Sequence, residues 1–287
     1  MENNRICPIC GSTQVQIKFK LDFNIFECGG CKHQFCPDAS FDRSFESDLD
    51  EQNRLKALKN LRMQNFKSII NSIIRNSNVR PKGLEVGTGH GWFLETCKLN
   101  QIECLGIEPE TCFNDLYRQN DFKVINGFFP EAIPSGNKYD FIAYNDVFEH
   151  LPDINTIMPV NIEYLTSDGL LIINLPVQEG LTYSISKLAY FFGIKSMLNR
   201  MWQFNFHSPH LSYFTKKNLV TFANKYDFKL VDSFPLKTIN LSEVKDRVGE
   251  DKSANFISRI ISVLGVYLLY PFMQKFPDTF CFVFRKG

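Results

Sequence analysis

From residue 83 onward, short apolar runs alternate with segments whose apolar residues recur at helical spacing. The strand-like runs lie at residues 83–87, 103–109, 123–127, 139–146, 169–176, 228–234 and 279–287. The helix-like segments lie at residues 92–100, 111–119, 154–165 and 215–226. This alternation predicts an α/β fold with a doubly wound, mostly parallel, seven-stranded sheet and helices on both faces.

The part of the chain before residue 81 has three patterns of its own. Residues 12–27 alternate polar and apolar positions, as a β-hairpin does. Residues 37–50 are acidic, serine-rich and without a period, and residues 51–75 carry apolar positions at helical spacing. We therefore expect a small N-terminal unit at 1–40, a linker and helix at 41–80, and a main domain at 81–287.

The longest uncharged apolar stretch runs from Ile260 to Met273, and its 14 residues are fewer than the roughly 20 that a bilayer-spanning helix needs. Its apolar residues are not confined to one face of a helix. We interpret it as a buried helix, with a membrane-surface helix over residues 256–276 as the alternative.

Composition narrows the class of protein. The 32 basic and 31 acidic residues leave a net charge of +1, so a surface that coats nucleic acid is not expected. The N-terminus, MENNRICPIC, has no apolar signal region, which predicts a cytoplasmic protein. Its nine cysteines should then be reduced thiols or metal ligands rather than disulfides.

Four of these cysteines form a metal-binding pattern. The spacing C-x2-C-x17-C-x2-C lies within the range of structural zinc sites, and two such turns can present four thiolates tetrahedrally. The sequence therefore predicts a zinc ribbon around one structural Zn²⁺, with no coordination position open for catalysis. The predicted ligands are Cys7, Cys10, Cys28 and Cys31.

A glycine-rich turn follows the first strand of the main domain in GLEVGTGHGWFLE, residues 83–95. No lysine follows the glycines as a triphosphate loop requires, and a dinucleotide fingerprint would need glycine where Trp92 stands. The pattern is instead E-x-G-x-G-x-G, with Glu85 before Gly87, Gly89 and Gly91.

The acidic residues at the strand ends indicate the ligand. A carboxylate at Glu85 would repel a pyrophosphate, but it suits a ligand with an ammonium group and a cationic centre, such as S-adenosylmethionine. Glu108 ends the second strand, about 20 residues after the first glycine, where an acid can accept hydrogen bonds from ribose hydroxyls.

At this point the sequence resembles the class I S-adenosylmethionine-dependent methyltransferases. The segments LEVGTGHG, GIEP, YNDVFEHLPD and GLLIINLP look like the successive motifs of that family, and HLSYFT at 210–215 is similar to a stretch in one bacterial branch. The ribbon ahead of the domain resembles methyltransferases of bacterial surface-polysaccharide and deoxysugar pathways. The resemblance implies cofactor contacts at Glu85, Gly87, Gly89, Gly91, Glu108, Asn126, Gly127, Asn145 and Asp146.

Methyl transfer to a hydroxyl also requires a group that takes the proton, and histidine suits that task at neutral pH. His150 follows the fourth strand, where cofactor and acceptor should meet, although packing or capping explains it equally well. His207 and His210 flank Ser-Pro after the fifth strand; such a pair can also bind metal, but no third ligand is evident. The candidate catalytic residues are His150, His210 and His207.

The insertion at about 177–214 is longer than the usual connection between a strand and the next helix. Its aromatic and basic residues favour a substrate lid, because rings stack on sugar faces and cations suit phosphates. The alternative is a helical subdomain packed on the core, which could carry a homodimer interface.

These features lead to one preferred function and three alternatives. The preferred one is methylation of a sugar hydroxyl on a nucleotide- or lipid-linked glycan precursor in surface-polysaccharide biosynthesis. The alternatives are C-methylation of a deoxysugar nucleotide, methylation of ribosomal RNA, and a non-catalytic scaffold. An acidic N-terminal segment argues against RNA, since RNA binding favours a basic ribbon with stacking aromatics.

Overall fold

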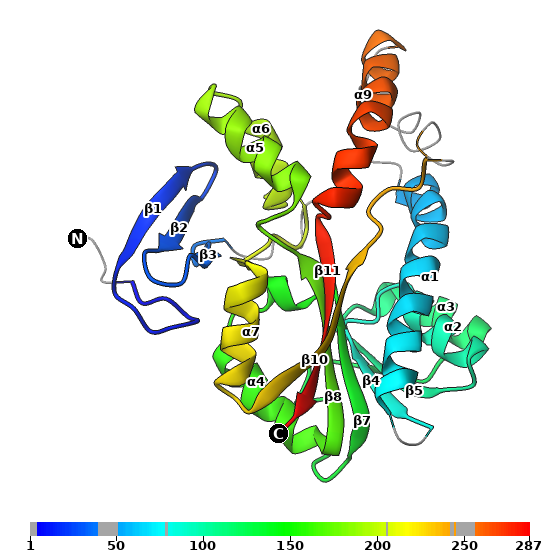
Figure 1. The fold of residues 1–287 in the computed structure, drawn as a ribbon. Helices are drawn as coiled ribbons and strands as arrows, with labels where there is room; N and C mark the ends of the chain where they lie inside the picture. The colour runs from blue at the N-terminus through cyan, green and yellow to red at the C-terminus, as the bar shows by residue number, and fades with distance from the viewer. Residues whose placement is uncertain (1–4, 40–50, 78–79, 205, 242–243, 245–255) are drawn as a thin grey trace.

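A computed structural model describes residues 5–39, 51–77, 80–204, 206–241, 244 and 256–287; the side chains of 51–57 and 256–262 are outside the description. A seven-stranded sheet with the order β10-β11-β8-β7-β4-β5-β6 forms its centre (Figure 1). The strands are β4 (Lys82–Val86), β5 (Glu103–Glu108), β6 (Val124–Asn126), β7 (Tyr139–Asn145), β8 (Leu165–Pro176), β10 (Phe228–Leu236) and β11 (Thr279–Lys286).

The strand directions agree with the sequence prediction of a mostly parallel, doubly wound sheet. Strands β4 to β8 pair in parallel, and β11 pairs antiparallel with both β8 and β10. The order reverses at β4, which lies between β5 and β7. In open α/β sheets, ligands bind at the carboxyl ends of the strands beside such a switch point.

Helices cover both faces of this sheet and bury two apolar layers. Residues of α1 and α2 pack with one face of β7, β8 and β11, while α4 and α7 pack on the other face. The main-domain helices and the long N-terminal helix all lie where sequence periodicity predicts them. They are α1 (Glu51–Asn76), α2 (Trp92–Leu99), α3 (Asn114–Asn120), α4 (Ile154–Tyr164) and α7 (Lys216–Asn224).

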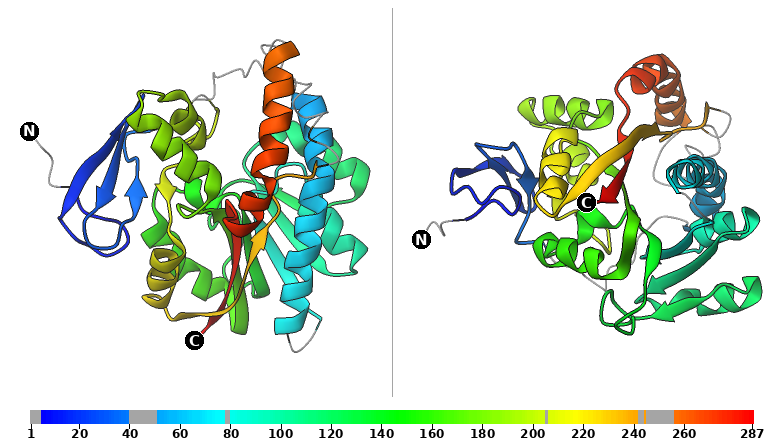
Figure 2. Two further views of the ribbon diagram at one scale, coloured as in Figure 1. Left: turned by 45° about the horizontal axis from the view of Figure 1, so that its top comes forward. Right: turned by 60° about the horizontal axis from the view of Figure 1, so that its bottom comes forward.

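The N-terminal ribbon is a second, smaller sheet. Strands β1 (Val15–Lys20) and β2 (Asn24–Cys28) form the predicted antiparallel hairpin, and β3 (Gln34–Phe35) pairs with β2. Its fourth strand, β9 (Ser212–Tyr213), comes from the end of the 177–214 insertion. The ribbon is therefore joined to the main domain by backbone hydrogen bonds, and it lies beside the insertion in both views of Figure 2. Most of the linker predicted at 37–50 lies outside the described residues.

The insertion forms two helices, α5 (Leu181–Phe191) and α6 (Ser196–Met201). Its rings Tyr183 and Trp202 are fully buried and pack with Phe19 of the ribbon, so they are not free to stack on a substrate. The prediction of a lid was wrong for these two rings, because sequence alone does not show that the ribbon covers them. The packed-subdomain alternative describes this part of the insertion.

Helix α9 (Phe256–Lys275) was predicted to be buried, and that prediction was wrong. Leu264 is 62% exposed and Leu268 is 75% exposed, and Phe272 is also exposed. The helix projects beyond the sheet rather than packing inside it (Figure 1). Within the described residues, no helix is long and apolar enough to cross a membrane.

Candidate functional site

The glycine-rich turn connects β4 to α2 at the carboxyl edge of the sheet. Gly87 and Gly91 have φ angles of 75° and 72°, a left-handed conformation that glycine adopts without strain. A Cβ on Gly87 would lie 2.6 Å from Val147 Cγ2, so close packing also requires glycine there. Gly89, with φ 52°, has open space where its Cβ would be, so a ligand can lie against it, while its N–H bonds to Glu108 and its carbonyl accepts from Tyr117.

Glu108 ends β5 beside this turn. Its carboxylate accepts hydrogen bonds from the backbone N–H of Gly89 at 2.8 Å and of Glu110 at 3.0 Å. The side chain is largely buried, which raises its pKa, while the two N–H groups favour the charged form. These two bonds leave acceptor capacity on the carboxylate for further donors such as ribose hydroxyls.

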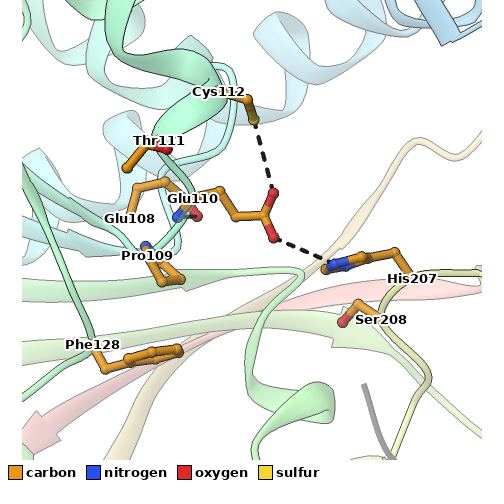
Figure 3. A pocket seen from close by; sticks show the side chains of 8 residues that line it. All are labelled: Glu108, Pro109, Glu110, Thr111, Cys112, Phe128, His207 and Ser208. Carbon is orange, nitrogen blue, oxygen red and sulfur yellow. Dashed lines mark hydrogen bonds and ion pairs between the residues drawn. The ribbon is translucent and has the colours of Figure 1, made fainter. Parts of the chain in front are cut away.

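A cavity of about 590 Å³ opens at Glu108, and Figure 3 shows the side chains that line it. His207 reaches across from the insertion and lies 3.5 Å from the Glu110 carboxylate. Sequence reasoning identified Glu108 and His207 among the lining residues and missed the other six, which are Pro109, Glu110, Thr111, Cys112, Phe128 and Ser208. Thr111 and Cys112 come two and three residues after GIEP, and this closeness to Glu108 was the available signal, but their residue types have no distinctive chemistry there.

Glu85 lies at the end of β4 in a buried chain of polar side chains. The Asn145 amide donates to Glu85 Oε1 at 2.9 Å, and the Asn174 amide donates to Asn145 at 2.8 Å. Glu85 Oε2 has no partner among the described residues. Burial raises the pKa of Glu85 well above its usual value, and the charge of Glu108 adds to this. A cationic ligand would provide a partner for Glu85 Oε2 and would offset the free-energy cost of a buried carboxylate charge.

The remaining residues predicted for the cofactor separate into two groups. Asn126 and Gly127 lie beside Glu108: the Asn126 amide and the Gly127 N–H both donate to the Glu108 carbonyl, at 3.2 and 3.1 Å. Asp146 is turned away from this cavity and forms an ion pair with Arg62 of α1. The structure thus brings Glu85, Glu108 and the turn together and places Asp146 elsewhere.

A strand, a turn of three left-handed glycines and two buried acids form a site that fits S-adenosylmethionine. Residues 54–233 match the family profile described as "Methyltransferase domain", which is more than half of the chain. The chain belongs to the methyltransferase domain family. The enzyme is an S-adenosylmethionine-dependent methyltransferase, and a comparison with curated proteins gives no match.

Solved structures share the fold of this methyltransferase. The cyclopropane synthase MmaA2 from Mycobacterium tuberculosis superposes with a TM-score of 0.54 and 15% identity, over 76% of this chain and 83% of that one. The mycolic acid cyclopropane synthase CmaA1, complexed with SAH and CTAB, gives a TM-score of 0.52 and 12% identity over 76% and 83%. At these identities the likeness concerns the fold alone.

A second cavity, of about 350 Å³, lies at the same end of the methyltransferase sheet. Its walls come from α1, the ends of β7 and β8, the insertion and the start of β11. Its polar and charged lining residues are Arg62, Asp146, Glu149, Thr182, Arg200, Gln203, His210, Tyr213, Thr238, Asp278 and Thr279. Unlike the cavity at Glu108, this second cavity is lined by both a carboxylate and an imidazole that are almost fully buried, those of Glu149 and His210.

These buried groups form a cluster of Glu149, His150 and His210. The distance from Glu149 Oε1 to His210 Nε2 is 3.9 Å, and the ring centroids of His150 and His210 are 4.7 Å apart. Burial lowers the pKa of both histidines and, together with the charge of Asp146, raises the pKa of Glu149. The structure therefore brings two predicted catalytic histidines together, adds Glu149, which sequence reasoning missed, and places His207 in the other cavity.

The four predicted zinc ligands also come together. The Sγ atoms of Cys7 and Cys31 are 3.5 Å apart, as are those of Cys10 and Cys28, and all four lie within 4.8 Å of one another. The hydrogen bond with Cys31 lowers the pKa of Cys7 to about 5. His33 and Cys36 are buried nearby and are not part of this cluster.

Proposed function

We propose that this enzyme methylates a hydroxyl group on the sugar of a lipid-linked glycan precursor at a membrane surface. The observation that carries the proposal is the position of the polar second cavity. It lies at the cofactor end of the sheet and also between two projecting helical arms, whose surfaces are apolar and basic.

The lining of the second cavity suits a sugar phosphate. Thr182, Gln203 and Asp278 offer donors and acceptors for sugar hydroxyls, and Arg200 offers a guanidinium for a phosphate. We therefore assign this cavity to the acceptor and name it the acceptor cavity. The cavity at Glu108 is assigned to the adenosine part of the cofactor, with His207 and Phe128 as further contacts.

S-Adenosylmethionine, when bound, supplies a methyl group that is already activated on sulfur. Glu85 would hold the cationic methionyl end and Glu108 the ribose hydroxyls, and the open space at Gly89 would let the ligand lie against the glycine turn. Alignment of the acceptor oxygen with the methyl carbon supplies most of the rate. The hydroxyl proton leaves beside His150 and His210; a neutral imidazole there can accept a proton or hold a cation.

The two arms are residues 181–201, which contain α5 and α6, and α9. They project from the same end of the sheet in the views of Figures 1 and 2. The exposed apolar side chains of the first arm are Leu188, Phe191, Phe192, Ile194 and Met197. Those described on and directly after the second arm are Leu264, Tyr267, Leu268, Leu269, Phe272 and Phe276.

The charges on the arms suit an anionic lipid surface. The first arm has three Lys or Arg and no Asp or Glu, and the second arm has two Lys or Arg and no Asp or Glu. Each basic residue near an anionic bilayer contributes about 1 kcal/mol, in addition to burial of the apolar side chains. An anionic bilayer is therefore the occupant that we propose for both arms.

The four-cysteine cluster is proposed to hold one structural Zn²⁺. Zinc–sulfur bonds of about 2.3 Å in a tetrahedron place sulfur atoms roughly 3.8 Å apart. The pairs at 3.5 Å, within a group no wider than 4.8 Å, fit that arrangement with small side-chain shifts.

The activity is tested by incubating the purified enzyme with radiolabelled S-adenosylmethionine and, in parallel, with extracted lipid-linked sugars, sugar nucleotides or ribosomal RNA. Label in the lipid-linked fraction, released as a methyl ether, is the expected result. Label in sugar nucleotides alone would support methyl transfer to a sugar but would refute the proposal that the acceptor is lipid-linked. Label in ribosomal RNA alone would refute a sugar acceptor.

Membrane docking is tested by flotation with vesicles that contain or lack anionic lipid. We expect binding to the anionic vesicles only, and a loss of at least tenfold when Phe191 and Phe192 are both changed to serine. The matched control is Leu99→Ser, since Leu99 is equally apolar and 66% exposed on α2, away from the arms. Equal binding of the double variant and the control would contradict the proposal.

A further inference from the structure

We infer that Glu149, His150 and His210 form a binding site for one divalent transition-metal cation in the wall of the acceptor cavity. The inference rests on the proposed function only for the role of the cation in methyl transfer. The cation site itself follows from the side-chain atoms that the fold brings together.

The backbone holds the three residues in place from two directions. Glu149 and His150 belong to a short 3-10 helix, Phe148–His150, which begins three residues after the end of β7 at Asn145. His210 comes from the insertion, where its N–H donates to the Trp202 carbonyl at 3.0 Å, and the next N–H, of Leu211, donates to the Glu149 carbonyl at 2.9 Å. This hydrogen bond fixes the segment with His210 against the segment with Glu149.

Two polar atoms of the cluster are buried and unpartnered. Glu149 Oε2 and His210 Nδ1 have no hydrogen-bond partner in the described part of the chain, and both side chains are more than nine-tenths buried. An unpaired buried acceptor costs about 1 to 3 kcal/mol, so such atoms are normally satisfied. A cation bound by the carboxylate and by His210 Nε2, the ring atom that faces Glu149, would give the carboxylate the partner that Oε2 lacks and would balance its buried charge.

The orientation of His150 fits a ligand role. Its Nδ1 lies 2.8 Å from the Pro209 carbonyl, to which it can donate, and this leaves Nε2 as the atom with a free lone pair. A metal-binding histidine typically donates its other N–H to a carbonyl or carboxylate in this way. One ligand atom from each of the three residues lies within 4.8 Å of the others. On binding, these distances would contract to roughly 3 to 3.5 Å.

The ligand types indicate which cations fit. Two imidazoles and one carboxylate suit Zn²⁺, Fe²⁺, Co²⁺ or Mn²⁺, whereas Mg²⁺ and Ca²⁺ prefer oxygen ligands. Three protein ligands leave at least one coordination position open, and Glu149 and His210 line the acceptor cavity. The four-cysteine cluster has no such position, so the chain would carry two metal sites of different chemistry.

A cation at this position has a direct use in methyl transfer. It lowers the pKa of a hydroxyl bound at its open position, as metal ions do for bound water. The acceptor oxygen then bonds to the methyl carbon while the carbon–sulfur bond breaks. The electron pair of that bond goes to sulfur, and the hydroxyl proton goes to solvent water. In this account His150 and His210 are metal ligands rather than bases.

The test is an optical titration with Co²⁺ of enzyme that has been brought to one zinc per chain, so that zinc fills the four-cysteine cluster and the second site is open. We expect one Co²⁺ per chain with visible ligand-field bands and no sulfur-to-cobalt charge transfer, because nitrogen and oxygen bind it. Glu149→Gln and His210→Asn should each weaken Co²⁺ binding at least tenfold. His207→Asn, a matched loss of one histidine from the other cavity, should leave Co²⁺ binding unchanged.

Two outcomes would overturn the inference: no Co²⁺ beyond the thiol site, or equal Co²⁺ affinity in wild type and His210→Asn. S-Adenosylhomocysteine binding, measured on the same samples, separates failure of the cation site from failure of the proposed function. Activity that survives complete removal of this metal, but not His210→Asn, would refute the ligand role in catalysis and support a base.

Discussion

The role of Glu108 makes a quantitative prediction about cofactor affinity. In Glu108→Gln the side chain keeps its shape and loses its charge. In the wild type, one carboxylate oxygen accepts from Gly89 N at 2.8 Å and the other accepts from Glu110 N at 3.0 Å. In the variant, one of these two oxygens is replaced by an NH₂ group, which cannot accept a hydrogen bond. The variant therefore loses one bond to the turn or to its neighbour, and it also loses the charged acceptor for ribose.

Hydrogen bonds to a charged partner contribute about 1.5 to 3 kcal/mol each. We expect a loss of about 2 to 3 kcal/mol in binding of S-adenosylhomocysteine, which is a roughly 30- to 150-fold rise in Kd. Isothermal titration calorimetry at neutral pH measures this directly. The matched control is Glu110→Gln, which removes an acid from the same cavity but from an exposed side chain.

A Kd within threefold of wild type, in a variant with an unchanged melting temperature, would refute the assignment of the ribose to Glu108. A large fall in melting temperature would instead show that the carboxylate mainly supports the glycine turn. Affinity measured on Glu108→Asp then tests the ribose contact separately, since aspartate keeps the charge on a shorter side chain.

Three further predictions follow from buried groups and close contacts. Burial raises the pKa of Glu85 in the folded state, so above pH ~4.5 the folded state binds more protons than the unfolded state, and stability falls as pH rises. Glu85→Gln should therefore raise the melting temperature of the ligand-free protein at pH 8, and this gain should vanish near pH 4.5. A gain that does not depend on pH would refute this cause. Gly87 has a φ of 75°, and an added Cβ would lie 2.6 Å from Val147, so Gly87→Ala should lower the free energy of unfolding in urea by about 1 to 3 kcal/mol. The control Gly136→Ala, at a φ of 89° with open space around the added Cβ, should lower it by about 1 kcal/mol. Cys28→Ser should remove the zinc of the four-cysteine cluster in metal analysis and make the ribbon susceptible to protease, whereas Cys112→Ser, at an exposed thiol outside the cluster, should do neither.

Much of the main domain could be predicted from the sequence because its signals are local. Each strand of the large sheet is a short apolar run, and the turn needs glycine at three positions for reasons of backbone conformation. Glu85 and Glu108 could be identified because each ends a strand beside the switch point. Once the sheet is recognised, the order of the strands along the chain is enough to predict which residues lie at this edge of the sheet.

The parts that the sequence did not reveal depend on contacts between distant segments. Trp202 and Tyr183 have the composition of a substrate surface, but Phe19, more than 160 residues earlier, packs with them. Helix α9 is apolar, yet hydropathy does not show whether another element covers it. The cluster of Glu149 with His210 joins residues about 60 positions apart through a hydrogen bond of the Leu211 backbone.

The pairing of β3 with β9 has a consequence for synthesis of the protein. The hairpin of β1 and β2 and its neighbour β3 leave the ribosome first, but the strand that covers the outer edge of β3 follows about 180 residues later. At translation rates of about 5 to 20 residues per second, this edge stays unpaired for roughly 10 to 40 seconds. An open strand edge is a site for pairing with other chains. If the four thiols bind Zn²⁺ as proposed, early capture of the metal would hold the nascent ribbon in its native register during that interval, and zinc supply in the producing cell would then govern the yield of correctly folded enzyme.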